Sequence, residues 1–283
     1  MSVRIITDSA SDISQAEAKV LGIDVLPLKT IFGEEEFLDG VTIDHVTFYN
    51  KLIESDVLPT TSQLSPFDYE QAFRAAVERG EEVVCIVVSS KLSGCFQSAN
   101  IAAEEFEGRV TVVDSRSVAI GERIMVQIAL QARDEGKSAP EIADILNTQA
   151  EKLRLIALVD TLEYLKKGGR VSSAAAFAGG LLGIKPVIAI EDGTIAILGK
   201  ARGSKNGNNM LMQLVEQNGG IDFSRPFALA YSGLDDSMLQ KYITDSAALY
   251  EGKADTLPIH TIGSTIGTHA GPGAIAVAFF SNN

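Results

Sequence analysis

The first half of the chain alternates between short apolar runs and longer amphipathic segments. Apolar runs rich in β-branched residues at 3–8, 82–90 and 109–115 each end in a polar turn, which is typical of strands buried on both faces of a sheet. A further strand is predicted over 25–32, with a short one after it. Helices are predicted where apolar residues recur every three or four positions, within 45–55, 66–79, 91–106, 118–136 and 139–153. This alternation favours a doubly wound domain with a parallel sheet.

The pattern changes after about residue 153. A strand, a short helix and a basic glycine-rich turn are predicted over 153–172, and a hairpin over 184–202 turns at Glu191-Asp192-Gly193. The other predicted elements are helices near 204–218 and 236–250 and strands near 226–231, 256–261 and 273–280. We therefore expect a mixed sheet covered by helices, and two domains, at 1–152 and 153–283.

Composition narrows the class of protein. The chain has 283 residues, 46% of them hydrophobic, which is enough to bury a substantial core. Its 24 Lys and Arg against 37 Asp and Glu leave a net charge of −13, which argues against binding to nucleic acid or anionic membranes. No apolar stretch approaches the ~18–20 residues of a membrane span, and the N-terminus does not resemble a signal peptide. Cys85 and Cys95 form no CxxC pair, so we expect free thiols and a cytoplasmic protein.

Polar residues follow three of the predicted strands, at the carboxyl ends where ligands of parallel sheets gather. In SSKLSGCFQSA, Ser93 and Gly94 precede a helix whose N-terminal N–H groups favour an anion. Alternatively, Ser93 is simply the N-cap of that helix. Cys95 is expected to be a small packing residue, because no base that would activate a cysteine nucleophile is indicated by spacing.

The stretch PTTSQLSP carries more polar groups than a helix start needs. Ser65 is expected to cap a helix that begins at Pro66. The helix cap does not account for Thr61, Ser62 and Gln63, which form either a turn or a lid that hydrogen-bonds to a ligand.

Two basic, glycine-rich segments stand out in this acidic chain. They are KKGGRVS, which contains Arg170, and GKARGSKNG, which contains Arg202 and Lys205. Each is either a surface turn or a site for an anionic ligand or an acidic partner surface.

His269 is one of three histidines and lies between Gly267 and Gly271. The glycines allow a ligand to approach the backbone closely. Taken alone, however, His269 is more simply interpreted as a turn residue before a buried strand.

No nucleotide-binding loop, dinucleotide motif, zinc-protease motif or kinase motif occurs in the sequence. Asp8, Asp39 and Asp114 offer carboxylates to a metal in principle, but their spacing selects none. We therefore expect neither a metal nor a cofactor.

Seven motifs together resemble one family. They are ITDSASD, PTTSQLSP, VVSSKLSGCFQSA, VVDSRSVAIGE, LEYLKKGGRVS, KPVIAIEDGTIAILGKARGSK and IGTHAGPGAIAVAF. They occur in the order found in the DegV family, whose members include the fatty-acid-binding subunits of bacterial fatty acid kinase, and they span nearly the whole chain.

The resemblance implies a three-layer α/β/α N-terminal domain with a parallel sheet and a two-layer α/β C-terminal domain with a mixed sheet. A long-chain fatty acid of about 14–18 carbons would lie between them, with its tail buried. A separate kinase subunit would phosphorylate the acid to an acyl phosphate for phospholipid synthesis, so the chain itself would be no enzyme. The implied carboxylate-binding residues are Thr61, Ser62, Ser93, Gly94, Arg170 and His269, and the implied kinase-docking residues are Arg202 and Lys205.

One alternative is a hydrolase or acyl transferase that uses Ser93 and His269, although the sequence indicates no third group to orient the histidine. One departure from the family pattern is Cys95-Phe96, where related proteins commonly have Thr-Tyr. This difference is expected to alter the pocket wall and the acyl preference, while Ser93 and Gly94 are retained.

Overall fold

The first layers of the molecule are built on a parallel sheet. The computed structural model describes residues 2–171, 183–250, 252–253 and 256–282. The sheet has the order β2-β1-β6-β7, and its strands are β1 (Val3–Asp8), β2 (Asp24–Leu26), β6 (Glu82–Val87) and β7 (Val110–Asp114). Its predicted strands end, as expected, at Asp8 and at Asp114.

Helices cover both faces of this sheet. Helices α3 (Pro66–Glu78) and α4 (Cys95–Ala103) pack on one face, where Ile6 and Cys85 point. The other face, where Ile5 and Ile86 point, is covered by α1 (Gln15–Leu21), α5 (Ala119–Asp134) and α6 (Ala139–Ala150). The alternation of side chains along β1 and β6 thus supplies a core on each face.

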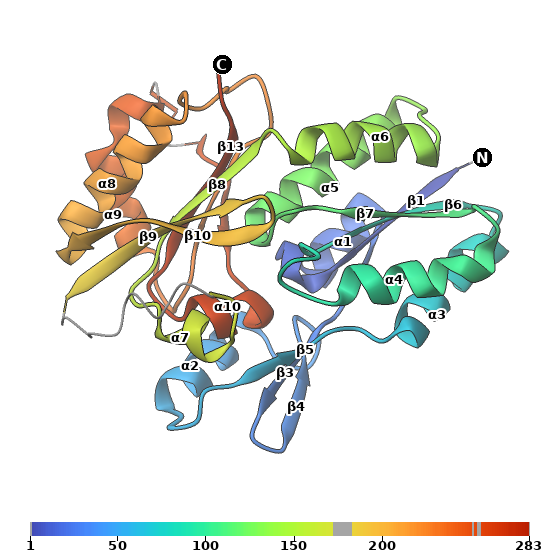
Figure 1. The fold of residues 1–283 in the computed structure, drawn as a ribbon, viewed down its shortest axis with the longest axis horizontal. Helices are drawn as coiled ribbons and strands as arrows, with labels where there is room; N and C mark the ends of the chain where they lie inside the picture. The colour runs from blue at the N-terminus through green and yellow to red at the C-terminus, as the bar shows by residue number, and fades with distance from the viewer. Residues whose placement is uncertain (1, 172–182, 251, 254–255, 283) are drawn as a thin grey trace.

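The second sheet is mixed and six-stranded, with the order β10-β9-β8-β13-β11-β12. Helices α8 (Gly203–Gln217) and α9 (Ser237–Asp245) lie on its outer face (Figure 1). The predicted fold class, an α/β/α domain with a parallel sheet followed by an α/β domain with a mixed sheet, is confirmed. The strands are β8 (Leu153–Leu158), β9 (Ile184–Glu191), β10 (Thr194–Arg202), β11 (Ala228–Tyr231), β12 (Ile259–Thr261) and β13 (Ile275–Phe280).

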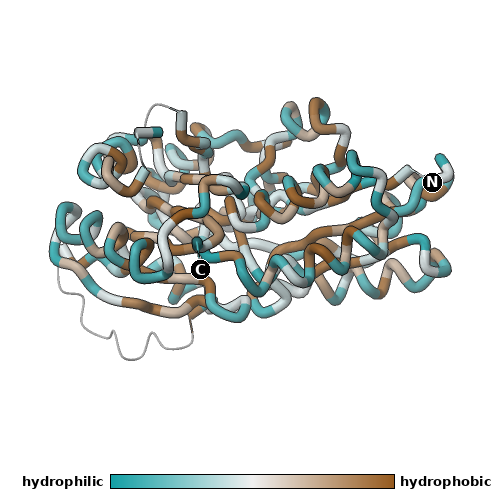
Figure 2. The backbone as a smooth tube through the Cα atoms, turned by 90° about the horizontal axis from the view of Figure 1, so that it is seen from above, coloured by the Kyte–Doolittle hydropathy of each residue, from teal (hydrophilic) through white to brown (hydrophobic). Residues whose placement is uncertain are grey.

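Helix α5 lies between the two sheets and contacts β1 and β6 on one side and β8, β11 and β13 on the other. Twelve of its 16 residues are buried. The largest hydrophobic cluster therefore contains residues from both halves of the chain, and the division at 152/153 stays a prediction. Viewed from above, hydrophobic and hydrophilic residues alternate along the outer helices (Figure 2), as expected for helices that cover a core.

A small third sheet was not predicted. It has the order β4-β3-β5, with β3 (Lys29–Phe32), β4 (Glu35–Leu38) and β5 (Thr60–Ser62), and α2 (His45–Glu54) follows β4. The single strand predicted over 25–32 is wrong, because the chain leaves β2 at Pro27 and enters β3 in the other sheet. At the break, the Leu28 N–H donates to Ser9 Oγ over 3.0 Å rather than to a strand.

The helix predicted over 236–250 is shorter than expected. Helix α9 ends at Asp245, and a 3₁₀ turn over Ala247–Tyr250 follows it. Among the residues that the structure describes, no helix is both long and apolar enough to cross a membrane.

Candidate functional site

An apolar cavity lies between the two sheets, and a row of alanines on the mixed sheet makes room for it. Ala157 of β8 pairs with Ala276 of β13, which in turn pairs with Ala230 of β11. All three line the cavity. The neighbouring residues on these strands point to the opposite face and are bulky, among them Ile156 and Val277 in the cluster under α8 and α9. Small side chains on one face of the sheet thus leave a space that large ones would fill.

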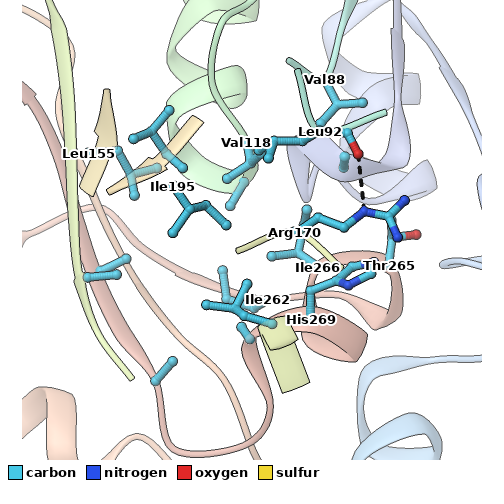
Figure 3. Close-up of a pocket in the computed structure, with 18 of the residues that line it drawn as sticks. Val88, Leu92, Val118, Leu155, Arg170, Ile195, Ile262, Thr265, Ile266 and His269 are labelled. Carbon is cyan, nitrogen blue, oxygen red and sulfur yellow. Dashed lines mark hydrogen bonds between the residues drawn. The ribbon is translucent and has the colours of Figure 1, made fainter. Parts of the chain in front are cut away.

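The opposite wall comes from the parallel sheet. Val88 and Leu92 lie in the loop after β6, and Val118 precedes α5 (Figure 3). Of the polar residues predicted at the strand ends, only Ser93 lines this mainly apolar space. The apolar lining also includes Leu28, Leu165, Ile188, Ile190, Ile195, Ile262 and Ile266.

The polar residues gather at one end of the cavity. Figure 3 shows Arg170 and His269 side by side there, with Leu155 and Ile195 at the far end. The imidazole Nε2 of His269 is 2.9 Å from Thr61 Oγ1, which joins α10 (Ser264–Ala270) to β5. Of the six residues implied to bind the carboxylate, five line this cavity: Thr61, Ser62, Ser93, Arg170 and His269.

His269 lies in the last turn of α10, so its interpretation as a turn residue is wrong. The helix is held from the first half of the chain. Asp39 accepts hydrogen bonds from the N–H groups of Ser264 (2.9 Å) and Thr265 (3.1 Å), and Asp12 accepts one from the Gly263 N–H. These carboxylates satisfy N-terminal donors of a helix that lacks a cap of its own.

The glycines beside His269 serve helix packing rather than ligand approach. A Cβ on Gly267 would lie 2.6 Å from both Phe48 and Tyr49 of α2. Gly271 has a φ of +70°, and a Cβ there would lie 2.3 Å from the ring of Tyr164.

The guanidinium of Arg170 has no acidic partner within the described part of the chain. Its Nε donates to Leu92 O over 3.2 Å, and its Nη1 donates to Gly168 O over 2.6 Å. Both acceptors are backbone carbonyls, which orient the planar group without neutralising it. A half-buried cation of this kind favours an anionic ligand.

The imidazole of His269 is uncharged near neutral pH. Burial, followed by the positive charge of Arg170, lowers its pKa to about 4. Its Nδ1 is buried without a hydrogen-bond partner among the described residues. A Cβ on Gly168 would lie 2.3 Å from this nitrogen, so Gly168 leaves the space that the ring occupies.

The serine hydroxyls at this end, unlike that of Thr61, have only local partners. Ser62 Oγ donates to Gln63 O over 3.3 Å, and Ser93 Oγ donates to Cys95 Sγ over 3.2 Å. The expectation that Ser93 is the N-cap of α4 is wrong, because Gly94 takes that position. The Ser93 hydroxyl instead accepts from the N–H of Cys95, the first residue of the helix.

Gly94 does not line the cavity, unlike the other five residues. A Cβ there would lie 2.0 Å from Oε1 of Gln63. Gln63 itself lines the cavity and donates to Ser98 Oγ over 3.1 Å. Gly94 therefore makes room for Gln63, which the sequence assigns to a turn or a hydrogen-bonding lid and not to the carboxylate-binding set.

Ser93 and His269 do not form a catalytic triad. They share no hydrogen bond, and in the described part of the chain the His269 ring is hydrogen-bonded to Thr61 and to no carboxylate. Cys95 is fully buried, as expected of a packing residue, and burial raises the pKa of its thiol to about 11.

The three aspartates considered as metal ligands bind backbone groups instead. Asp8 accepts from the N–H groups of Ala10 and Val88, and Asp114 accepts from those of Ser90 and Arg116. Asp39 caps α10, as described above. Across the described ranges, no group of three or more His, Cys, Asp or Glu is arranged to hold a metal ion.

Arg202 and Lys205 lie away from the cavity, at the junction of β10 and α8. Both are exposed, and neither forms an ion pair with another described residue.

Comparison with known proteins decides the family. A sequence model described as "Uncharacterised protein, DegV family" matches residues 2–282. The chain belongs to the DegV family. A DegV domain-containing protein of Deinococcus radiodurans is 35% identical over 282 residues, which cover 98% of each chain.

Two solved structures share the fold. One, reported as fatty acid binding of a DegV family protein from Thermus thermophilus, is 34% identical with a TM-score of 0.86, covering 99% of this chain and 100% of that one. The other, a stearic acid-binding protein from Eubacterium ventriosum, is 27% identical with a TM-score of 0.84, covering 98% and 97%.

Proposed function

We propose that this DegV protein binds a long-chain fatty acid, with the tail in the cavity between the sheets and the carboxylate at Arg170 and His269. The observation that carries the proposal is the cavity itself, which is apolar along its length and ends at a cation without an acidic partner among the described residues. The structures from Thermus thermophilus and Eubacterium ventriosum support the ligand class, since both are described as fatty-acid binders.

The tail supplies the affinity. Burying a methylene group contributes about 0.8 kcal/mol, so a chain of about 16 carbons gives roughly 11 kcal/mol before ordering costs are subtracted. The aliphatic lining and the alanine row offer the tail no polar partner that it would have to displace.

The carboxylate needs hydrogen bonds and charge once it leaves water. Arg170 supplies the charge, and the hydroxyls of Ser62 and Ser93 supply donors whose partners are local. Thr61 adds a third hydroxyl, which is paired with His269 Nε2 over 2.9 Å. Gly94 supports the site indirectly, by leaving space for Gln63.

A binding protein fits the site better than the hydrolase or acyl transferase alternative. A serine nucleophile needs a base within hydrogen-bond reach, and the base needs an orienting group. Ser93 is bonded to Cys95 instead, and no carboxylate orients His269 within the described residues.

We further propose that a kinase subunit phosphorylates the bound acid for phospholipid synthesis, as the family resemblance implies. Arg202 and Lys205 support a docking role, because they give an exposed basic surface to a chain of net charge −13. The phosphoryl-transfer groups would come from the partner, since the sequence has no nucleotide-binding motif.

The test is to extract the purified, denatured protein and identify its ligand by mass spectrometry, expecting a fatty acid of about 14–18 carbons. Arg170→Gln should weaken rebinding of that acid by about tenfold or more, because a hydrogen-bonded charge is lost. Arg79→Gln removes an exposed Arg far from the cavity and should leave binding unchanged. Failure of the wild-type protein to carry or bind any such acid would overturn the proposal.

The loaded protein is then offered to a fatty acid kinase catalytic subunit with ATP, and acyl phosphate is trapped with hydroxylamine. The Arg202→Ala, Lys205→Ala double variant should still bind the acid. If it yields no trapped acyl phosphate, the result supports docking of the kinase at that surface. Steady hydrolysis of acyl esters that Ser93→Ala abolishes would favour the enzyme alternative instead.

A further inference from the structure

The mixed sheet opens at the end of the cavity that lies far from Arg170. Strands β8 and β9 pair at three positions, the last being Ile156 with Ala189. Leu155 and Ile190 are one step beyond this pair, where the strands separate. The cleft between the separated strands is largely polar, and its lining includes Arg116, Glu151, Arg154, Glu191, Asp192 and Asn218.

Leu155 and Ile190 border both spaces, the apolar cavity on one side and the polar cleft on the other. Figure 3 places Leu155, together with Ile195, at the end of the cavity opposite Arg170 and His269. These two side chains therefore form a wall between an apolar and a polar compartment.

The tip of the β9–β10 hairpin holds this wall against the parallel sheet (Figure 1). Ser89 Oγ, in the loop after β6, donates to Gly193 O over 2.7 Å. Arg116, in the loop after β7, pairs with Asp192 at 2.9 Å and with Glu151 at 3.6 Å. The hairpin tip is thus fixed to loops of the opposite sheet by a buried hydrogen bond and by one ion pair, and Arg116 also pairs with Glu151 at the end of α6.

We propose that the Leu155–Ile190 wall ends the acyl channel and sets the longest fatty acid that the protein holds. This inference rests on the proposed function. Each methylene inside the cavity strengthens binding about fourfold, whereas a methylene forced past the wall removes water from the charged side chains of the cleft and costs free energy. Affinity should therefore rise with chain length up to a limit and then fall.

The experiment loads ligand-free protein with an equimolar mixture of saturated acids and measures the bound distribution by mass spectrometry. Ile190→Ala removes three carbons from the wall, so the upper length limit should move up by about two carbons. Ile190→Phe extends the wall inward without creating a cavity, so the limit should move down.

Val187→Ala is the control, because Val187 lies three residues away on the same strand, packs in the cluster under α8 and α9, and borders neither the cavity nor the cleft. Its upper limit should equal that of the wild-type protein. The wall is overturned if both Ile190 variants keep the wild-type limit, or if Val187→Ala shifts it as far as Ile190→Ala does. A wild-type protein that binds no acid of any length would refute the proposed function instead.

Discussion

At the scale of single residues, the His269 imidazole combines burial, an unpartnered nitrogen and a neighbouring cation. Burial and the charge of Arg170 both favour the neutral ring and lower its pKa to about 4. Neutral His269 offers one hydrogen bond to Thr61, while Arg170 remains the charge for an anion. His269 thus positions the Thr61 hydroxyl, and Arg170 supplies the positive charge that would neutralise an anion.

The lowered pKa of His269 predicts a pH-dependent stability. The unfolded histidine gains a proton near pH 6.5, whereas the folded one does so only near pH 4. The contribution of neutral His269 to the free energy of unfolding is therefore complete above pH 6.5 and is lost as the pH falls toward 4. Between pH 7.5 and pH 5, the ligand-free wild-type protein should lose about 2 kcal/mol more than His269→Gln in denaturant titrations.

Comparison with this variant is needed because other groups titrate in the same range. Burial raises the pKa of Asp8 to about 7, so its contribution is present below its unfolded pKa near 3.8 and is lost as the pH rises toward 7. That opposite trend is common to both proteins and cancels in the difference. Parallel stability curves for the wild type and His269→Gln would contradict the lowered pKa of His269.

The site residues were predictable only as a set. Thr61, Arg170 and His269 are 208 residues apart at the extremes, and each has an ordinary role as a turn or surface residue when taken alone. Their order within family motifs identified them. Gln63 was named only for a turn or a lid, because its place beside the cavity depends on the absence of a Cβ on Gly94, which lies in another loop.

At the scale of elements, α10 shows why some of the secondary structure was not predictable. The segment STIGTHA mixes a glycine with β-branched residues, which are poor helix formers. Its cap comes from Asp39, 225 residues away. The β-branched runs of β1, β6 and β7, in contrast, specify strands locally and were predicted correctly.

The cap predicts a long-range effect on the site. Asp39→Ala removes three hydrogen bonds to the first turn of α10, from two N–H groups and one hydroxyl. Because these donors are buried, we expect a loss of about 2–4 kcal/mol in the free energy of unfolding and weaker retention of the acid. Chemical denaturation and quantification of the bound ligand measure the two effects.

Ser138→Ala provides the comparison for a cap at a helix away from the cavity. Ser138 forms a capping box at α6, and its loss should cost about 1 kcal/mol without changing the bound ligand. If Asp39→Ala behaves in the same way, α10 is positioned by its packing against α2 rather than by its cap.

At the scale of the whole molecule, the cavity exists because two sheets meet along α5 and separate beyond it. The sequence AIAVAFF shows the alternation of small and large residues along β13. It does not show that Ala276 stands in register with Ala157 and Ala230, because that row joins strands from three distant parts of the chain. The parallel and mixed sheets were predictable from periodicity, whereas the space between them follows only from their pairing.

Two alanines of β13 distinguish the cavity from the packed core. Ala276 and Ala278 point to the same face of the sheet and belong to the same core cluster, which includes α5, but only Ala276 lines the cavity. Ala276→Leu should place its added carbons in empty apolar space, keep or raise the stability of the ligand-free protein and reduce the bound acid at least tenfold. Ala278→Leu should overpack the core and cost about 1–3 kcal/mol. Thermal unfolding of the delipidated proteins and mass spectrometry of the bound acid distinguish the two variants. An Ala276→Leu protein that binds the wild-type amount of acid would show that the tail does not cross the alanine row.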